Sequence, residues 1–121
     1  MSKFVIREVA TGFKFDLKAT NGQTILSSEI YSSRAAALNG VDSVRRNAPI
    51  ANVENQTEEG FAVLTHPKFE MYADKAGEFR FRLKATNGQI IGTSEGYTAK
   101  AGCLNGIDSV KANAADAETE E

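Results

Sequence analysis

The chain of 121 residues contains one cysteine, one histidine, two prolines and no tryptophan. Its only cysteine, Cys103, cannot form an internal disulfide, which favours a reducing compartment. Together with the only histidine, His66, it cannot supply the ligands of a structural zinc site. No glycine-rich loop joins a strand to a helix in the way that phosphate-binding loops do. We therefore expect no metal ion and no cofactor.

The chain also lacks a strong net charge and long hydrophobic runs. Its formal net charge is −2 at pH 7, which argues against attraction of the whole molecule to nucleic acid or to an anionic membrane. No apolar run approaches the roughly 20 residues that a membrane-spanning helix needs, and the stretch from Met1 to Phe4 lacks the apolar core of a signal peptide. These features predict a globular cytoplasmic protein with no membrane contact.

What the chain does contain is a duplication. Residues 15–23 read Phe-Asp-Leu-Lys-Ala-Thr-Asn-Gly-Gln, and residues 81–89 repeat this run with arginine in place of the aspartate. The match continues through Val44 in copy one and Val110 in copy two, and about 21 of 34 aligned positions are identical over residues 15–48 and 81–114, at a spacing of about 66 residues. Because each copy alone is near the lower size limit for an independent core, we expect the two copies to share one.

Each copy opens with strands and a hairpin. Apolar and charged residues alternate over residues 13–19 and 79–85, which is typical of a strand with one buried face. The dipeptides Asn21-Gly22 and Asn87-Gly88 then predict tight turns, because glycine reaches positive φ at no steric cost.

The loop length of these hairpins decides the register of the next strand. A two-residue loop pairs Leu17 with Leu26, whereas a three-residue loop ending in a glycine bulge pairs Leu17 with Ile25. Since a slip of one residue turns a strand inside out, only one register is correct. Both copies keep the isoleucine, so we favour the three-residue loop and predict the pairs Leu17 with Ile25 and Leu83 with Ile91.

A helix follows each hairpin and runs to about Arg46 in copy one and Ala112 in copy two. Ser32 and Thr98 are the expected N-caps. Apolar residues recur at helical spacing on one face of each helix, namely Ala37, Val41, Val44 and Ala48, and Cys103, Ile107, Val110 and Ala114.

Glycine and asparagine recur at matching positions of the two helices. Gly40 and Gly106 lie in the helix interior, where glycine costs about 1 kcal/mol relative to alanine. We interpret them as points of close packing, with contact between a ligand and the helix backbone as the alternative. Asn47 and Asn113 are expected to end the helices in a left-handed conformation.

The pattern divides the chain into four parts. Repeat one covers residues 1–58 as β-β-β-α-β, with a short last strand near residues 51–55. Residues 59–67 form a spacer, in which 61–65 are either a strand or an extended segment. Repeat two covers residues 68–114 as β-β-β-α, and the small acidic residues 115–121 are expected to form a disordered tail.

Few residues are candidates for catalysis. His66 has no counterpart in copy two, and Cys103 falls on the apolar helix face, so a turn histidine and a core cysteine are the simpler interpretations. Glu29 and Glu95 precede the helix in both copies. They could approach each other as paired carboxylates, or each could stabilise its own helix N-terminus by roughly 0.3–1 kcal/mol.

Two groups of residues are candidates for binding. The first is a basic surface on the open face of the sheet, offset only by Asp16 and Glu78. An antiparallel sheet also carries such charges for solubility alone, and the aromatic residues of these strands point inward rather than outward for base stacking. The second is a polar pair on the outer face of each helix, which is kept in both copies. The basic residues are Lys14, Lys18, Arg80, Arg82 and Lys84, and the helix pairs are Asn39 with Asp42 and Asn105 with Asp108.

The repeated runs Leu-Lys-Ala-Thr-Asn-Gly-Gln, Ser-Glu with a following tyrosine, and Gly-[Val/Ile]-Asp-Ser-Val resemble the YegP-like family of small uncharacterised bacterial proteins. The resemblance covers about residues 3–48 and 69–114. It implies two tandem repeats in one continuous antiparallel sheet that exchange their last strands across a pseudo-twofold axis. The long spacer and the absence of an apolar stretch after the second helix depart from that pattern. They make the exchanged strand an expectation for copy one and leave it open for copy two.

The expected fold is therefore α+β, with two tandem β-β-β-α(-β) repeats related by a pseudo-twofold axis, one antiparallel sheet and both helices on one face. We expect a monomer that is an internal pseudo-dimer. For function, the sequence favours a non-catalytic cytoplasmic binding or accessory protein. One alternative is a binder of nucleic acid or another polyanion through the basic sheet face, and a second is a small enzyme that uses Glu29 and Glu95.

Overall fold

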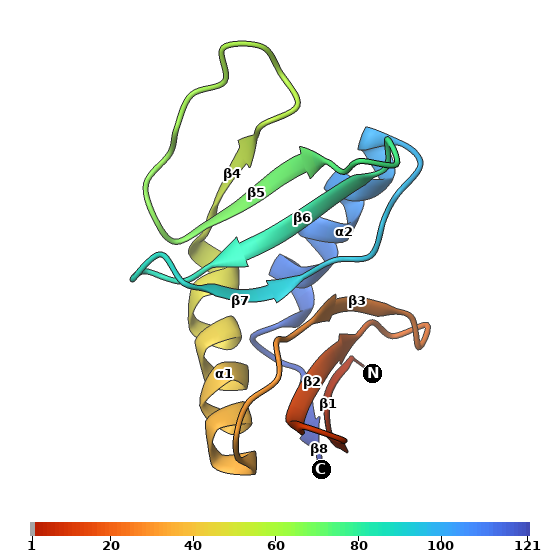
Figure 1. Cartoon of the computed structure of the whole chain (residues 1–121), viewed down its shortest axis with the longest axis vertical. Coiled ribbons are helices and arrows are strands. Elements are labelled where there is room, and N and C mark those ends of the chain that lie inside the picture. The colour runs from red at the N-terminus through yellow and green to blue at the C-terminus, as the bar shows by residue number, and fades with distance from the viewer. Residues whose placement is uncertain (1) are drawn as a thin grey trace.

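The structure is a computed structural model that describes residues 2–121. Two repeats of three strands, one helix and a last strand follow one another along the chain (Figure 1). Repeat one contains β1 (Lys3–Val9), β2 (Gly12–Lys18), β3 (Thr24–Ser27), α1 (Arg34–Asn47), a short 3₁₀ turn η1 (Ala48–Ile50) and β4 (Asn52–Asn55). Repeat two contains β5 (Lys68–Ala73), β6 (Phe79–Lys84), β7 (Ile90–Thr93), α2 (Lys100–Asn113) and β8 (Glu118–Glu120).

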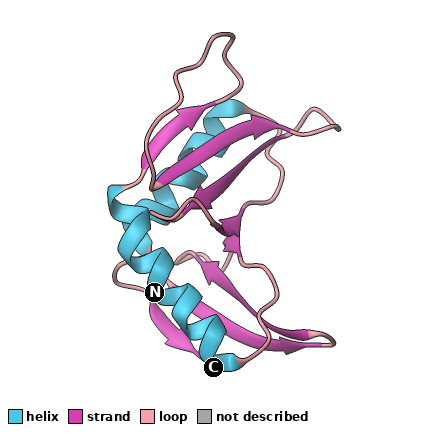
Figure 2. Cartoon of the chain, turned by 60° about the vertical axis from the view of Figure 1, so that its left-hand side comes forward, coloured by secondary structure: helices cyan, strands magenta, loops and turns pink. Residues whose placement is uncertain are grey.

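The strands form one sheet in the order β4-β5-β6-β7-β3-β2-β1-β8. Within each repeat the hairpins are antiparallel, and the two halves meet where β3 pairs with β7 at Ser27 and Thr93. Both helices cover the same face of this sheet (Figures 1 and 2). The α+β class and the duplicated architecture are confirmed, with the difference that the two outermost strand pairs are parallel, so the sheet is mixed.

Each repeat gives its last strand to the other repeat. The strand β4 of repeat one pairs with β5, and β8 of repeat two pairs with β1. The prediction that residues 115–121 form a disordered tail is therefore wrong, and copy two has its last strand. Arg45 of α1 holds this segment, because its guanidinium donates to the Ala117 carbonyl at 2.6 Å and to the Thr119 hydroxyl at 2.7 Å.

The segment between β4 and β5 contains no strand in this structure. Residues 61–65 form a loop that projects beyond the sheet (Figure 1). The strand alternative for this segment is therefore wrong.

The hairpins have the expected loop and an unexpected register. In copy one, Ala19 and Gln23 close a three-residue loop with a 2.9 Å backbone hydrogen bond. Leu17 nevertheless pairs with Leu26, because a β-bulge leaves Ile25 as an extra residue between the paired positions. The second hairpin does the same, so the predicted pairs Leu17 with Ile25 and Leu83 with Ile91 are wrong.

The helix faces are as predicted, and the helix ends differ from prediction. All eight residues of the two predicted apolar faces are fully buried. The N-cap of α1 is Ser33, whose hydroxyl accepts the Ala36 N–H, and that of α2 is Ala99 without a side-chain bond, so Ser32 and Thr98 are not the caps. In the described part of the chain no residue other than glycine has positive φ, so Asn47 and Asn113 are not left-handed caps. Their amides instead donate to the carbonyls of Ser43 and Ser109, each at 2.8 Å.

Gly40 and Gly106 are points of close packing, as predicted. A Cβ on Gly40 would lie 2.8 Å from Cζ of Tyr31 and 2.9 Å from the Phe15 ring, because these two rings stack beneath the helix. Gly106 has the same relation to Tyr97, whose Cζ lies 2.9 Å from the site of a Cβ. Each helix can therefore approach its aromatic pair only through glycine.

Where the two repeats meet near the pseudo-twofold axis, equivalent positions carry residues of different size. Leu26 lies against Gly92, which is its own counterpart in copy two, and the Leu26 Cγ is 2.6 Å from the position that a Cβ on Gly92 would take. Two leucines would collide at this junction and two glycines would leave a void. The two copies are thus complementary rather than identical where they meet.

Candidate functional site

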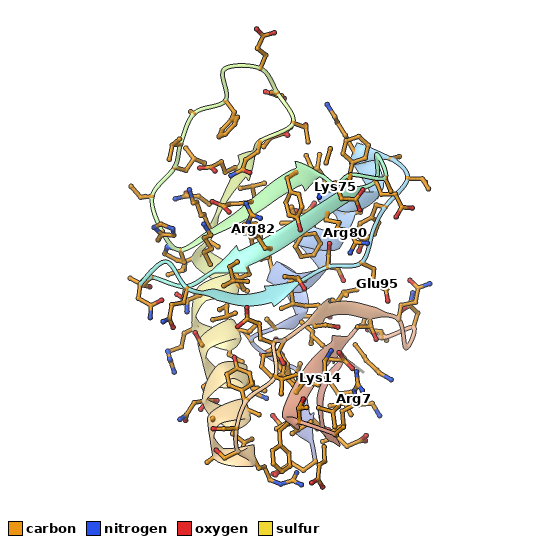
Figure 3. The ribbon with its side chains drawn as sticks, viewed as in Figure 1. Arg7, Lys14, Lys75, Arg80, Arg82 and Glu95 are labelled. Atoms are coloured by element: carbon orange, nitrogen blue, oxygen red, sulfur yellow. The ribbon has the colours of Figure 1, made fainter. Side chains whose placement is uncertain are left out.

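The basic sheet face is largely neutralised by carboxylates. Figure 3 shows Arg80 and Arg82 together on the open face, with Arg7 and Lys14 on the other half of the sheet. Arg80 binds Asp74 at 2.7 Å and Arg82 binds Glu70 at 2.6 Å. The structure brings Lys84 to Glu70 as well, at 3.2 Å. In the described part of the chain only Lys14 and Lys18, of the predicted basic set, have no carboxylate partner.

Glu70 belongs to a buried ion cluster with Glu54 and Lys68. The Lys68 ammonium lies 2.8 Å from Glu54 and 3.2 Å from Glu70, and all three side chains are at most 5% exposed. Burial acts to raise the pKa of Glu54, but hydrogen bonds from Lys68, Gln56 and the Leu64 N–H outweigh it and lower this pKa to about 2. Hydrogen bonding to Glu54 likewise raises the pKa of Lys68. The cluster fastens β4 and the loop after it to β5.

Repeat one carries an open version of the same contact. Lys3 on β1 binds Glu120 on β8 at 3.0 Å, and both side chains are about half exposed. Lys3 pairs with Lys18 and Lys68 pairs with Lys84, so Lys3 and Lys68 are equivalent. In the first strand of each copy, equivalent residues are one residue closer in the sequence than in the rest of the repeat. A comparison at the fixed spacing of the repeat therefore does not align Lys3 with Lys68. The recurrent Lys–Glu contact is therefore part of the strand exchange.

Glu29 and Glu95 are exposed, and each contributes to raising the pKa of the tyrosine in its own copy. Burial and the Glu29 carboxylate raise the pKa of Tyr31. Burial, then Cys103 and Glu95, raise the pKa of Tyr97. Among the described residues neither carboxylate takes part in an ion pair or a side-chain hydrogen bond.

The two other candidates for catalysis have structural surroundings. Cys103 is fully buried in α2, and burial raises the pKa of its thiol to about 11, so it holds its proton at neutral pH. The His66 ring lies against the second hairpin, 3.6 Å from the position of a Cβ on Gly88. Within residues 2–121, no three His, Cys, Asp or Glu side chains come together as a metal site, and no helix is long and apolar enough to cross a membrane.

The polar pairs on the outer faces of the helices lie outside the core. Asn39, Asp42, Asn105 and Asp108 are all exposed, and only Asp42 has an ionic partner among the described residues, Arg45 at 3.4 Å. Leu104, beside Asn105, is 38% exposed. Most other residues that both copies keep have structural roles: the stacked tyrosines, the hairpin residues, the core, and Ser28 and Ser94, whose hydroxyls accept the N–H of Phe15 and Phe81.

Two clefts on the described part of the chain take residues from both copies. A groove of about 360 Å³ lies between the C-terminal end of α1 and the second hairpin. Part of its polar lining is already used, because Asn47 bonds to Ser43 and accepts the Thr86 hydroxyl at 3.0 Å. A second cleft, of about 320 Å³, lies between the first hairpin and the segment after β7. It is lined by Gln23, Thr24, Ile25, Glu95, Gly96 and Tyr97.

Comparison with known proteins recovers the duplication and the fold. The family model of a domain of unknown function, DUF1508, matches residues 9–55 and again residues 74–121. A UPF0339 protein from the ptx operon 5' region of Stutzerimonas stutzeri is 40% identical over 117 residues, which make up 97% of this chain and 92% of that protein.

Two further similarities concern the repeat and its structure. A UPF0339 protein of Treponema denticola is 59% identical over 54 residues, which make up 45% of this chain and 93% of that protein, so it is about one repeat long. The solution NMR structure of yegP, a protein of unknown function from Escherichia coli, superposes with a TM-score of 0.78 at 38% identity. That match covers 98% of this chain and 90% of that one.

Proposed function

Since the chain belongs to the DUF1508 or YegP-like family of bacterial proteins, for which no function is established, we propose its role from its own residues: a non-catalytic binding or accessory protein of the cytoplasm. It binds a protein partner through the outer faces of α1 and α2. The binding surface, here called the helix patches, consists of Leu38, Asn39 and Asp42 in copy one and Leu104, Asn105 and Asp108 in copy two.

One observation carries this proposal. Two diverged copies keep Asn39 with Asp42, and Asn105 with Asp108, although these side chains are exposed and the only ion pair among them in the described part of the chain is Asp42 with Arg45 at 3.4 Å. Exposed polar residues that the fold does not need are expected to diverge as freely as the other surface positions. In copy two, the exposed Leu104 beside Asn105 and Asp108 also combines the apolar and polar contacts that protein interfaces use.

Catalysis and polyanion binding have weaker support. The only thiol is buried with a raised pKa, and each retained glutamate stands by the tyrosine of its own copy. The arginines that suggested a polyanion surface are held by Asp74 and Glu70 within the protein, so their charge is already compensated.

The test is chemical cross-linking in the native host followed by quantification of the proteins captured. The quadruple variant N39A/D42A/N105A/D108A is compared with wild type, and the double variant K14A/K18A serves as the surface control. Both sets of side chains lie away from the core, so thermal unfolding should stay within a few degrees of wild type. We expect the quadruple variant to lose specific partners that the control keeps. Equal capture by both variants would contradict the helix patches as the binding surface, and loss only in K14A/K18A would favour the sheet face.

A further inference from the structure

The cleft of about 320 Å³ between the repeats has a different segment of the chain on each side. One wall is the start of β3, with Gln23 and Thr24 above the buried Ile25, and the other is the segment from Glu95 to Tyr97. Figure 3 shows Glu95 on the strand side of the molecule, where the segment after β7 passes β3. An apolar floor and polar rims are typical of sites that hold a small ligand.

The small residues that leave this cleft open are replaced by larger ones at the equivalent place in the other half of the molecule. At the pseudo-equivalent place, Ile30 stands where the cleft has Gly96, and Ile90 stands where it has Thr24. Ile30 packs on Gly12, with its Cγ2 at 2.9 Å from the position of a Cβ there. The duplication therefore provides one open, polar version of this surface and one version with bulky apolar side chains.

The cleft is lined by one acidic side chain, Glu95, and the carboxylate of Glu78 lies close to it. Glu95 takes part in no ion pair in the described part of the chain, and neither does Glu78, whose carboxylate lies over Gly96 with Cδ 3.0 Å from the site of a Cβ. The nearby cation Arg80 is held by Asp74 at 2.7 Å and by the Ser94 carbonyl at 3.3 Å.

From the cleft, its open Gly96 wall and its free Glu95 carboxylate, we infer that this chain binds an organic cation, a primary amine or guanidinium group on a short aliphatic stem. The Glu95 carboxylate accepts the cationic N–H groups, for which charged hydrogen bonds are strong. The stem lies on the buried Ile25. The inference is independent of the helix patches. The same chemistry occurs in free amines and guanidines and in the side chains of lysine and arginine.

The experiment is an NMR titration of the ¹⁵N-labelled full chain with butylguanidinium, and in parallel with the amidated peptide Gly-Arg-Gly. Butanol and butyrate are the neutral and anionic controls. We expect saturable shifts at the amides of Gln23, Thr24, Gly96 and Tyr97, with a dissociation constant on the order of 1 mM for so small a probe. Saturation by butylguanidinium indicates a free cation as ligand, and saturation by the peptide alone indicates an arginine side chain.

Two variants and their internal counterparts make the test specific. E95Q keeps the shape of the cleft and should weaken binding by about tenfold or more, since a charged hydrogen bond becomes a neutral one. T24I should block the cleft by adding the side chain found at Ile90. Their controls, E29Q and I90T, should bind as wild type does. Each variant is checked by its own spectrum for an intact fold. Non-saturable shifts, equal shifts with butanol, or unchanged binding in E95Q would overturn the inference.

Discussion

Gly40 lies so close to the ring of Tyr31 that the smallest side chain would not fit between them. Gly40→Ala should therefore destabilise the protein by about 1–3 kcal/mol, because overpacking against a stacked aromatic pair outweighs the roughly 1 kcal/mol gain in helix propensity. Gly102 is the matched control. It lies in α2, and a Cβ there would make only ordinary contacts, the nearest at 3.4 Å from Tyr97.

Urea unfolding of the two variants distinguishes packing from propensity. Gly102→Ala should stabilise the protein by up to about 1 kcal/mol, since alanine has the higher helix propensity and meets no obstacle. If Gly40→Ala were stabilising to the same extent, the close approach of the helix to Tyr31 would be wrong.

Glu54 makes the stability of the protein depend on acid. Its folded-state pKa of about 2 lies below the ordinary value of 4.5, so its stabilisation is fully present above about pH 4.5 and is lost as pH falls towards 2. The amount lost is of order 3 kcal/mol, and Glu70, whose pKa is also lowered, adds to the loss in the same direction.

Chemical unfolding at several pH values between 7 and 2 measures this contribution. Glu54→Gln should be less stable than wild type at pH 7, because Lys68 keeps only Glu70 as a partner, and its stability should fall less steeply with acid. Glu120→Gln, which removes the equivalent exposed carboxylate, should change the free energy of unfolding by less than about 1 kcal/mol. The same pH dependence in wild type and Glu54→Gln would contradict the assigned role.

At the scale of elements, the strand exchange should be visible in β8. Truncation after Ala117 removes the parallel pairing of β8 with β1 and the contact of Arg45 with Thr119. With net contributions near 1 kcal/mol per hydrogen bond, we expect a loss of about 2 kcal/mol in the free energy of unfolding. The amides of β1 that face β8 should also exchange faster with solvent.

The control for this truncation is Glu118→Gln with Glu121→Gln, which changes the charge of the same segment and keeps its backbone. The control should retain both the stability and the slow exchange of β1. Unchanged exchange in the truncated protein would mean that β8 does not protect β1.

The sequence predicted the elements whose residues carry their own signal. The alternation over residues 13–19 marked β2, and the apolar spacing from Ala37 to Ala48 marked the buried face of α1. The last strand of copy two carries no such signal. Its Glu-Thr-Glu run has little strand propensity, and it forms through backbone pairing with β1 and through Arg45, which lies 72 residues before Ala117 in the chain.

The candidate site was less predictable than the fold. Alternation placed Arg82 and Lys84 on the outer face, but it could not show that Glu70 would meet both, because the partner comes from a neighbouring strand. The hairpin register was missed for a related reason: the three-residue loop formed as predicted, but a bulge at Ile25 makes Leu26 the partner of Leu17. Contacts across the sheet, rather than local propensity, decided these features.

At the scale of the whole molecule, each repeat supplies the strand that pairs with the outer edge of the other repeat's sheet: β4 pairs with β5, and β8 pairs with β1. The two copies exchange their last strands and repeat the same Lys–Glu ion pair. In each copy a basic side chain of the helix also binds a carbonyl just before the last strand: Arg45 binds that of Ala117, and Lys111 binds that of Ala51. The copies differ where identical residues would collide. What the fold does not use are the helix patches and the cleft at Glu95. Our functional proposals rest on that remainder.

The complementarity of Leu26 and Gly92 is the central claim about how the copies fit, and a double-mutant cycle by urea unfolding tests it most directly. Leu26→Gly should cost about 2–5 kcal/mol through a cavity, and Gly92→Leu about 1–3 kcal/mol through overpacking. The swapped variant with both changes should return to within about 1 kcal/mol of wild type, because the leucine introduced at position 92 would fill the space that the side chain of Leu26 occupies in wild type. A swapped variant whose loss equals the sum of the two single losses would contradict the pseudo-twofold junction.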